Sequence, residues 1–365
     1  MKRPKLVFLS SIASPHQVRY CEELQKYFDA TFLFYDRIGN RPEWWKIELP
    51  ESCIVLKHVW FKSISKYLTL SFWKYLNRIK PDILMLGGFS IPSNYLAFIW
   101  AKVHRVKTIV YTERSRNKKG KLRKKDIIWS FLHLLYCNVD HVLVTAEDSI
   151  QQFNDFGFNK VSYCPYATDL TDYFKHPIRE KKSGYTYLFP NRLVPLYNPL
   201  MAIDIFYEIY KLYPTSILKL NAQGELFEKC VERINELFIK DSVVFLNQIN
   251  KWDEMHLVYK ESDILIFPAL FSNGNFTIIE AMASGMGLVI SNKILGLGSE
   301  VRNSYNGFNC EPEIDIFVEN IQQYINKPEL FNEHSLINRN IAYKYSAEGV
   351  AEFFNEIINN YESKN

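Results

Sequence analysis

The chain has 365 residues, which is too long for one hydrophobic core of ordinary size and fits two domains of ~150 to 200 residues. Its net charge of +4 is too small to indicate nucleic acid as a partner, and no stretch approaches the ~20 apolar residues of a membrane-spanning helix. The 6 cysteines are widely spaced, with no CxxC pair and no neighbouring histidine, which favours reduced thiols over a metal site.

The first residues combine a basic start with a short apolar run, a pattern that a secretory signal peptide shares. The run is shorter than the apolar core of such a peptide and has no cleavage-like site after it, so it predicts a first β-strand. We therefore expect a cytoplasmic chain that meets a membrane, if at all, at the surface.

Short β-branched and aromatic runs then alternate with segments of helical period, which is typical of βαβ units with parallel sheets. In the first half the pattern predicts strands over residues 5–10, 31–35, 54–59, 82–86, 108–111, 141–144 and 161–164, and helices over 17–28, 66–79, 95–103 and 126–137. This half forms one doubly wound domain.

A charged stretch over 175–184 reads as a linker, after which the pattern starts again. It predicts strands over 185–189, 216–220, 242–246, 264–267 and 287–290, and helices over 199–210, 226–237, 252–261, 277–283, 314–325 and 347–361. The fold class is thus α/β with two Rossmann-like, doubly wound domains facing a central cleft. The predicted boundaries are 1–178, 179–345 and a terminal helix over 346–365.

The segment 268–285 carries the sharpest chemical signal. It leaves a strand and enters a helix, and the free N–H groups of a helix N-terminus suit an anion such as a diphosphate. The residues expected there are Ser272, Asn273, Gly274, Asn275, Phe276 and Thr277. Glu280 follows among apolar residues, where a carboxylate needs donors that two ribose hydroxyls would supply. The alternative places Glu280 on the solvent side of an amphipathic helix.

Polar residues also follow strands of the first half. His16 follows the first strand and could touch the acceptor or the donor sugar, or be a capping or surface histidine. Glu113 follows the strand over 108–111 and could orient or deprotonate an acceptor hydroxyl. The glycine pair at 87–90 could line the acceptor side through its backbone.

The run from Arg114 to Lys125 holds eight basic residues and no acidic one, and an apolar segment with a tryptophan follows. It is either a solvated loop or a patch for anionic lipid headgroups or a lipid-diphosphate acceptor.

Several of these motifs together resemble the retaining glycosyltransferases of family 4, which have the GT-B fold. The resemblance rests on the segment 268–285, RLV at 192–194, QGEL at 223–226, NGF at 306–308 and the ending 344–361. It implies that the terminal segment packs back onto the first domain. It also implies that Arg192 binds the donor phosphates, that Gly224 lies at the nucleotide and that Glu280 holds the ribose.

Two positions depart from that family. Ser272 stands where the family has the first glutamate of its signature, and Tyr197 stands where it has a lysine. A divergent subgroup, an inactive relative and a misaligned loop would each explain these differences, and we favour the first.

The resulting prediction is an enzyme that moves a sugar from a nucleotide donor, a UDP- or GDP-sugar, to a hydroxyl of a glycan or lipid-linked glycan in bacterial surface polysaccharide synthesis. Retention is implied by the resemblance alone. No cofactor or metal is expected, because no DxD triplet occurs and Arg192 and helix dipoles can meet the phosphate charge. The alternatives are a sugar-nucleotide epimerase and an inactive nucleotide- or glycan-binding relative. The lack of GxGxxG after the first strand disfavours an NAD-linked dehydrogenase.

Overall fold

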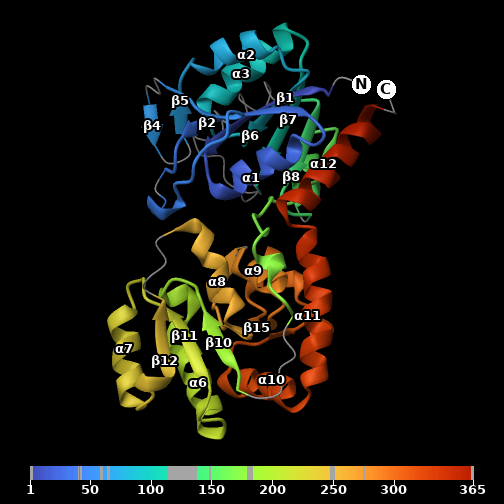
Figure 1. Ribbon diagram of the computed structural model, residues 1–365. Helices are drawn as coiled ribbons and strands as arrows, with labels where there is room; N and C mark the ends of the chain where they lie inside the picture. The colour runs from blue at the N-terminus through green and yellow to red at the C-terminus, as the bar shows by residue number, and fades with distance from the viewer. Residues whose placement is uncertain are drawn as a thin grey trace. The chain divides into compact units, whose positions relative to one another are not determined.

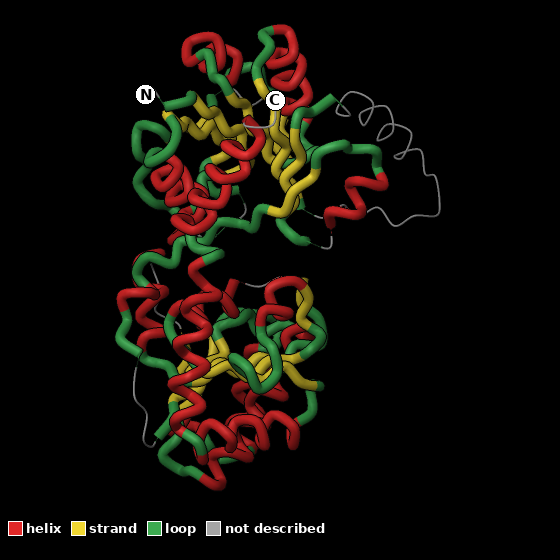
Figure 2. Tube along the Cα trace, turned by 90° about the vertical axis from the view of Figure 1, so that its right-hand side faces the viewer, coloured by secondary structure: helices red, strands yellow, loops and turns green. Residues whose placement is uncertain are grey.

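The computed structural model describes residues 3–39, 41, 43–57, 61–63, 66–113, 138–147, 149–178, 184–246, 251–273 and 276–362. The chain divides into two compact units. Unit 1 comprises residues 1–169 and 347–365, and unit 2 comprises 170–346. Each unit is a parallel sheet flanked by helices (Figures 1 and 2).

Unit 1 has a seven-stranded sheet in the order β3-β2-β1-β6-β7-β8-β9, and every adjacent pair is parallel. The strands are β1 (Lys5–Ile12), β2 (Asp29–Asp36), β3 (Cys53–Val55), β6 (Ile83–Gly87), β7 (Lys107–Thr112), β8 (His141–Val144) and β9 (Val161–Tyr163). The helices are α1 (Pro15–Leu24), α2 (Phe72–Ile79), α3 (Pro92–Val103), α5 (Ser149–Asp155) and α12 (Ala347–Glu362).

Strand alternation gives unit 1 two apolar layers. Leu6 and Phe8 of β1 join the core with α1 and α12, whereas Val7 and Leu9 join the core with α2, α3 and α5. The helix α12 contributes Val350, Ala351, Phe354 and Ile358 to the first of these layers. The end of the chain is therefore an integral part of unit 1.

Unit 2 has a six-stranded parallel sheet in the order β12-β11-β10-β13-β15-β17. The strands are β10 (Thr186–Phe189), β11 (Ile217–Asn221), β12 (Val243–Leu246), β13 (Ile264–Phe267), β15 (Gly287–Ser291) and β17 (Phe308–Cys310). The helices are α6 (Pro199–Leu212), α7 (Phe227–Glu236), α8 (Met255–Lys260), α9 (Phe276–Ala283), α10 (Ile314–Asn326) and α11 (Pro328–Tyr343). One continuous core runs through this unit.

The structure differs from the sequence prediction in a few elements. Residues 66–68 form β5 (Lys66–Leu68), which pairs with β4 (Phe61–Ser63) in a hairpin, and the helix predicted from residue 66 begins only at Phe72. A turn in which Ser71 N–H donates to Thr69 Oγ1 (3.0 Å) separates the two. The predictions missed α5, α11 and β17, and the helix predicted over 126–137 lies outside the described residues.

The division between the units also lies earlier than the predicted boundary at residue 178. Leu170 and Tyr173 are buried in the core of unit 2, so the segment after Asp169 belongs to unit 2. The predicted linker over 175–184 follows these residues.

None of the helices in the described part of the chain combines the length and the apolar character that crossing a bilayer requires.

Candidate functional site

In both sheets the first strand of the unit lies in the middle, so the chain order reverses beside it. The reversal falls between β1 and β6 in unit 1 and between β10 and β13 in unit 2. In open parallel sheets the loops that follow the strands at such a reversal diverge and leave a crevice for ligands. The loops after β1, β6, β10 and β13 are therefore the structural candidates for binding sites.

The loops after β10 and β13 are bonded to each other in unit 2. The N–H of Leu270 donates to the carbonyl of Leu196 (2.8 Å), and Thr277 Oγ1 donates to Asn191 Oδ1 (3.1 Å). Thr277 is buried in the first turn of α9, so this bond joins the helix to the residue that precedes Arg192. Arg192 itself is exposed beside this junction.

Gly224 lies in the loop after β11, and its position excludes any side chain. Its φ is +143°, and a Cβ would come within 2.4 Å of the Leu193 carbonyl oxygen. The turn is held to the Arg192 loop because Leu193 N–H donates to the Gln223 carbonyl (2.7 Å) and Leu226 N–H donates to the Leu193 carbonyl (2.9 Å). Arg192 and Gly224 therefore share one rigid corner of the sheet.

Ser272 and Asn273 do not cap a helix. They form the short strand β14 (Ser272–Asn273), which pairs in parallel with β16 (Ile294–Leu295), and the Ser272 side chain is buried. The sequence predicted the N-terminus of the helix within residues 272–276. The helix begins at Phe276, the last residue of that range. Gly274 and Asn275 lie outside the described residues.

Glu280 is buried, with 7% of its surface exposed, so it does not lie on a solvent-facing side of α9. Its carboxylate accepts a hydrogen bond from the Tyr259 hydroxyl (2.6 Å) of α8, and Tyr173 also lies close to it. Burial raises the pKa of Glu280 from its ordinary value of 4.5 to about 7, against the opposite effect of the two tyrosines. The sequence assigned the hydrogen-bond donors of Glu280 to ribose hydroxyls, but here Tyr259 donates to it, and sequence reasoning did not identify this tyrosine.

Tyr197, which replaces the family's lysine, packs as an aromatic residue. Its ring lies edge-on to Phe267 at the end of β13, with 5.6 Å between centroids. This position is part of the apolar packing below the crevice and brings no positive charge to it.

In unit 1, His16 is buried in the first turn of α1, after Ser14 at the N-cap. Its Nδ1 accepts a hydrogen bond from the backbone N–H of Asp169 (2.9 Å), and its ring lies edge-on to Trp45. Burial and the positive charge of Arg41 lower the pKa of His16 to about 3. The imidazole is therefore neutral at physiological pH, with its proton on Nε2.

Glu113 is exposed at the end of β7 and accepts a hydrogen bond from the Tyr166 hydroxyl (3.0 Å). Tyr166 and Asp169 belong to one short segment, so this segment contacts both Glu113 and His16. The glycine pair at the end of β6 adjoins β7, since Gly88 N–H donates to the Tyr111 carbonyl (2.8 Å). The basic run at 114–125 lies outside the described residues.

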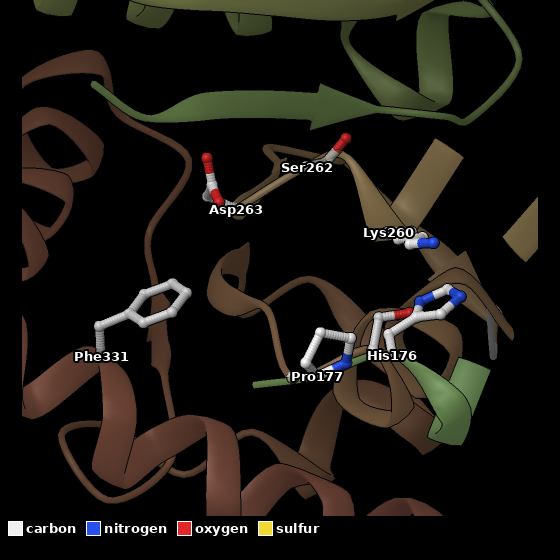
Figure 3. A pocket seen from close by; sticks show the side chains of 8 residues that line it. His176, Pro177, Lys260, Ser262, Asp263 and Phe331 are labelled. Carbon is white, nitrogen blue, oxygen red and sulfur yellow. The ribbon is translucent and has the colours of Figure 1, made fainter. Parts of the chain in front are cut away.

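A pocket in unit 2 lies at the opposite end of the sheet, where β13 begins (Figure 3). It is lined by His176, Pro177, Lys260, Ser262, Asp263, Ser284, Gly285 and Phe331, and its volume of about 10 Å³ is at the lower limit for one water molecule. Asp263 Oδ2 accepts the N–H of Thr186 (2.8 Å), which joins the starts of two strands. This pocket is a packing defect and not the donor crevice.

Comparison with known proteins assigns the chain to a family. Residues 171–361, more than half of the chain, match the family described as glycosyl transferases group 1. The chain belongs to this family. Arg192, Gly224 and Glu280 lie within the matched residues, whereas His16 and Glu113 lie outside them.

Two relatives in sequence carry glycosyltransferase names. An uncharacterized glycosyltransferase of Haemophilus influenzae is 30% identical over 43% of this chain and 44% of its own length. A UDP-Gal:alpha-D-GlcNAc-diphosphoundecaprenol alpha-1,3-galactosyltransferase of Escherichia coli is 25% identical over 68% of this chain and 67% of its own. The chain thus spans less than half of the first relative and about two thirds of the second.

The fold is that of solved glycosyltransferases. The structure of Anabaena Alr3699/HepE in complex with UDP covers 98% of this chain and 100% of its own, with a TM-score of 0.67 and 13% sequence identity. The prediction of two Rossmann-like domains in the GT-B arrangement of elements is confirmed at the level of the fold.

Proposed function

We propose that this family member transfers a sugar from a nucleoside diphosphate donor, a UDP- or GDP-sugar, to a hydroxyl of a glycan or lipid-linked glycan. The reaction retains the anomeric configuration and serves bacterial surface polysaccharide synthesis at the cytoplasmic face of the membrane. The observation that carries the proposal is the corner of unit 2 in which the Arg192 loop is bonded both to the Gly224 turn and to the first turn of α9. The name of the E. coli relative supports a UDP-sugar donor and a diphosphate-linked lipid acceptor.

The donor half of the reaction falls to unit 2. The planar guanidinium of Arg192 binds the diphosphate and stabilises the charge that develops on the leaving nucleotide. The missing side chain at Gly224 lets its loop pack directly against the backbone of Leu193, which keeps that loop beside Arg192. Glu280 accepts hydrogen bonds from the ribose hydroxyls in exchange for its bond to Tyr259. With Tyr197 in place of a lysine, Arg192 carries the phosphate charge without that cation, and neither a metal nor a cofactor takes part.

The acceptor half falls to unit 1. Glu113 is exposed and orients or deprotonates the attacking hydroxyl, with Tyr166 fixing its carboxylate. His16 acts as a hydrogen-bond donor through Nε2 and not as a base, because its Nδ1 already accepts the Asp169 N–H. The glycine pair after β6 lines this side through its backbone.

Binding and turnover with a panel of UDP-, GDP-, ADP- and CMP-sugars test the proposal. We expect one UDP- or GDP-sugar to raise the melting temperature, and Arg192→Ala or Glu280→Ala to lower its affinity at least about tenfold, as the loss of a charge-assisted bond implies. Lys229→Ala, at an exposed position on α7, serves as the control. If both site variants bind like the wild type, the assignment of the donor site is wrong.

Product analysis separates the reaction classes. NMR of the product made with a glycan acceptor should show the anomeric configuration of the donor. Interconversion of the nucleotide sugar without acceptor would instead indicate an epimerase, and nucleotide binding without turnover an inactive relative.

A further inference from the structure

Two helices on one face of unit 1 expose large apolar side chains. Trp73 of α2 is 43% exposed, and Ile99 and Val103 of α3 are 48% and 74% exposed. Leu70, just before α2, adds a fourth at 41%. The opposite sides of the same helices bury Phe72, Leu76, Ala97, Phe98 and Ala101 against the sheet, so the exposed side chains form the outer surface of this layer.

These side chains form one surface because a hydrogen bond joins the two helices and fixes which of their turns lie beside each other. Trp100 Nε1 of α3 donates to Asn77 Oδ1 of α2 (2.9 Å), and Figure 1 shows the helices beside each other. α2 leads into β6 and α3 into β7, and since these strands are parallel, the two helices run in the same direction. Trp73 lies one turn before Asn77, so it falls level with Leu96, one turn before Trp100, and Ile99 and Val103 follow on the next turns of α3.

The charge around this apolar surface has one sign. Residues 66–112 contain seven lysines and arginines and a single acidic residue, Asp82, which accepts the backbone N–H of Lys5 (2.8 Å). Lys102 pairs with Asp140 (2.9 Å). Four other basic residues on and after the two helices are exposed: Lys74, Arg78, Lys80 and Arg105. Within the described residues, none of these four takes part in an ion pair.

We propose that the surface formed by Leu70, Trp73, Ile99 and Val103 with these four basic residues docks onto a bilayer of anionic lipids. A tryptophan and aliphatic side chains enter the headgroup region, while lysine and arginine keep their charges at the phosphates and extend their apolar stems along the surface. Basic residues near a membrane are attracted by the negative surface potential of an anionic leaflet. The charge complementarity singles out an anionic partner, and the apolar centre singles out one with a hydrocarbon interior.

Co-sedimentation of the full-length protein with vesicles tests the proposal without donor or acceptor, so its failure and a failure of the proposed reaction are distinguishable. Two vesicle types are needed, pure phosphatidylcholine and phosphatidylcholine with phosphatidylglycerol, each at low and high salt. We expect binding to the anionic vesicles only, and weakening by high salt.

Two variants locate the surface. Ile99→Ser with Val103→Ser removes apolar contact, and Lys74→Glu with Arg78→Glu reverses two charges. Each pair should lower the partition coefficient for anionic vesicles at least about tenfold, because one pair loses apolar contact and the other replaces attraction to the lipid phosphates by repulsion. All four side chains are exposed, so circular dichroism should show an unchanged fold.

Matched controls lie in unit 2. Phe238→Ser removes an apolar side chain that is 92% exposed, and Lys229→Glu with Lys240→Glu reverses two exposed charges. These controls should bind vesicles like the wild type. Unchanged binding by the α2 and α3 variants, equal binding to neutral vesicles, or no binding by the wild type would overturn the proposal. So would a dimer, seen by light scattering, that these variants convert to monomer, because the surface would then join two copies of the chain.

Discussion

Glu280 is an ionisable residue whose burial opposes the charged form of its carboxyl group. Its carboxyl group is buried with two tyrosine hydroxyls, and its pKa is raised to about 7. The folded protein therefore keeps a proton that the unfolded chain releases near pH 4.5. The resulting contribution to stability is fully present below pH 4.5, falls as the pH rises, and is lost above pH 7.

Glu280→Gln should remove this dependence. Between pH 5 and pH 8 the free energy of unfolding of the wild type should fall by about 2 to 3 kcal/mol more than that of the variant, since one pKa unit corresponds to ~1.4 kcal/mol. Urea unfolding at the two pH values measures the difference, with the exposed Glu228→Gln as the control. Parallel losses in wild type and Glu280→Gln would show that the carboxyl group does not keep its proton in the fold.

His16 has a structural partner that can be tested separately from catalysis. His16→Ala leaves the Asp169 N–H without its acceptor and should cost about 1 to 3 kcal/mol of stability. His16→Asn offers an amide oxygen near the position of Nδ1 and should retain most of the stability of the wild type. Chemical denaturation compares the three proteins, and equal losses in both variants would contradict the role of this bond.

At the scale of the element, the loop after β11 depends on a glycine. Gly224→Ala forces a methyl group against the backbone of Leu193, so we expect a loss of about 2 to 4 kcal/mol from overpacking and backbone strain. The loop would also shift away from Arg192 and weaken nucleotide binding.

Gly184→Ala provides the matched control for this substitution. Its φ is +68°, but nothing lies within 4 Å of a Cβ there, so only the backbone term of about 1 kcal/mol applies. Thermal unfolding and nucleotide titration of both variants separate the clash from the strain. Similar losses at the two positions would mean that the Leu193 contact is unimportant.

At the scale of the whole molecule, the chain builds its units unequally. Unit 2 is one continuous stretch with a core of its own, whereas unit 1 borrows α12 from the far end of the chain. Residues 170–346 expressed alone should therefore unfold cooperatively on heating.

Residues 1–169 alone should be much less stable, because α12 buries Val350, Phe354 and Ile358 and each such side chain contributes about 1.5 to 3 kcal/mol. Joining residues 347–365 to this fragment through a flexible linker should restore a cooperative transition in circular dichroism. A stable fragment 1–169 without α12 would contradict this account.

The candidate site shows what sequence patterns reach and what they miss. The segment 268–285 identified Glu280 and Thr277, and the resemblance identified Arg192 and Gly224, because these residues lie in short motifs next to strands. Their contacts were not predictable, since Tyr259 and Asn191 are 21 and 86 residues away from their partners along the chain. The helix begins at Phe276, at the end of the predicted range 272–276, and only the place given to Ser272 was wrong, because pairing with β16 holds that residue in a strand.

The sequence by itself determined the alternation of strands and helices, the parallel α/β class and the family motifs, because hydrophobic period and strand-to-helix turns are local properties of the chain. Tertiary structure decided the rest. It joined α12 to the first unit, gave Glu280 a tyrosine partner, bonded His16 to the backbone of Asp169, and brought α2 beside α3. Each of these depends on residues distant in sequence meeting in space, where burial and charge set their chemistry.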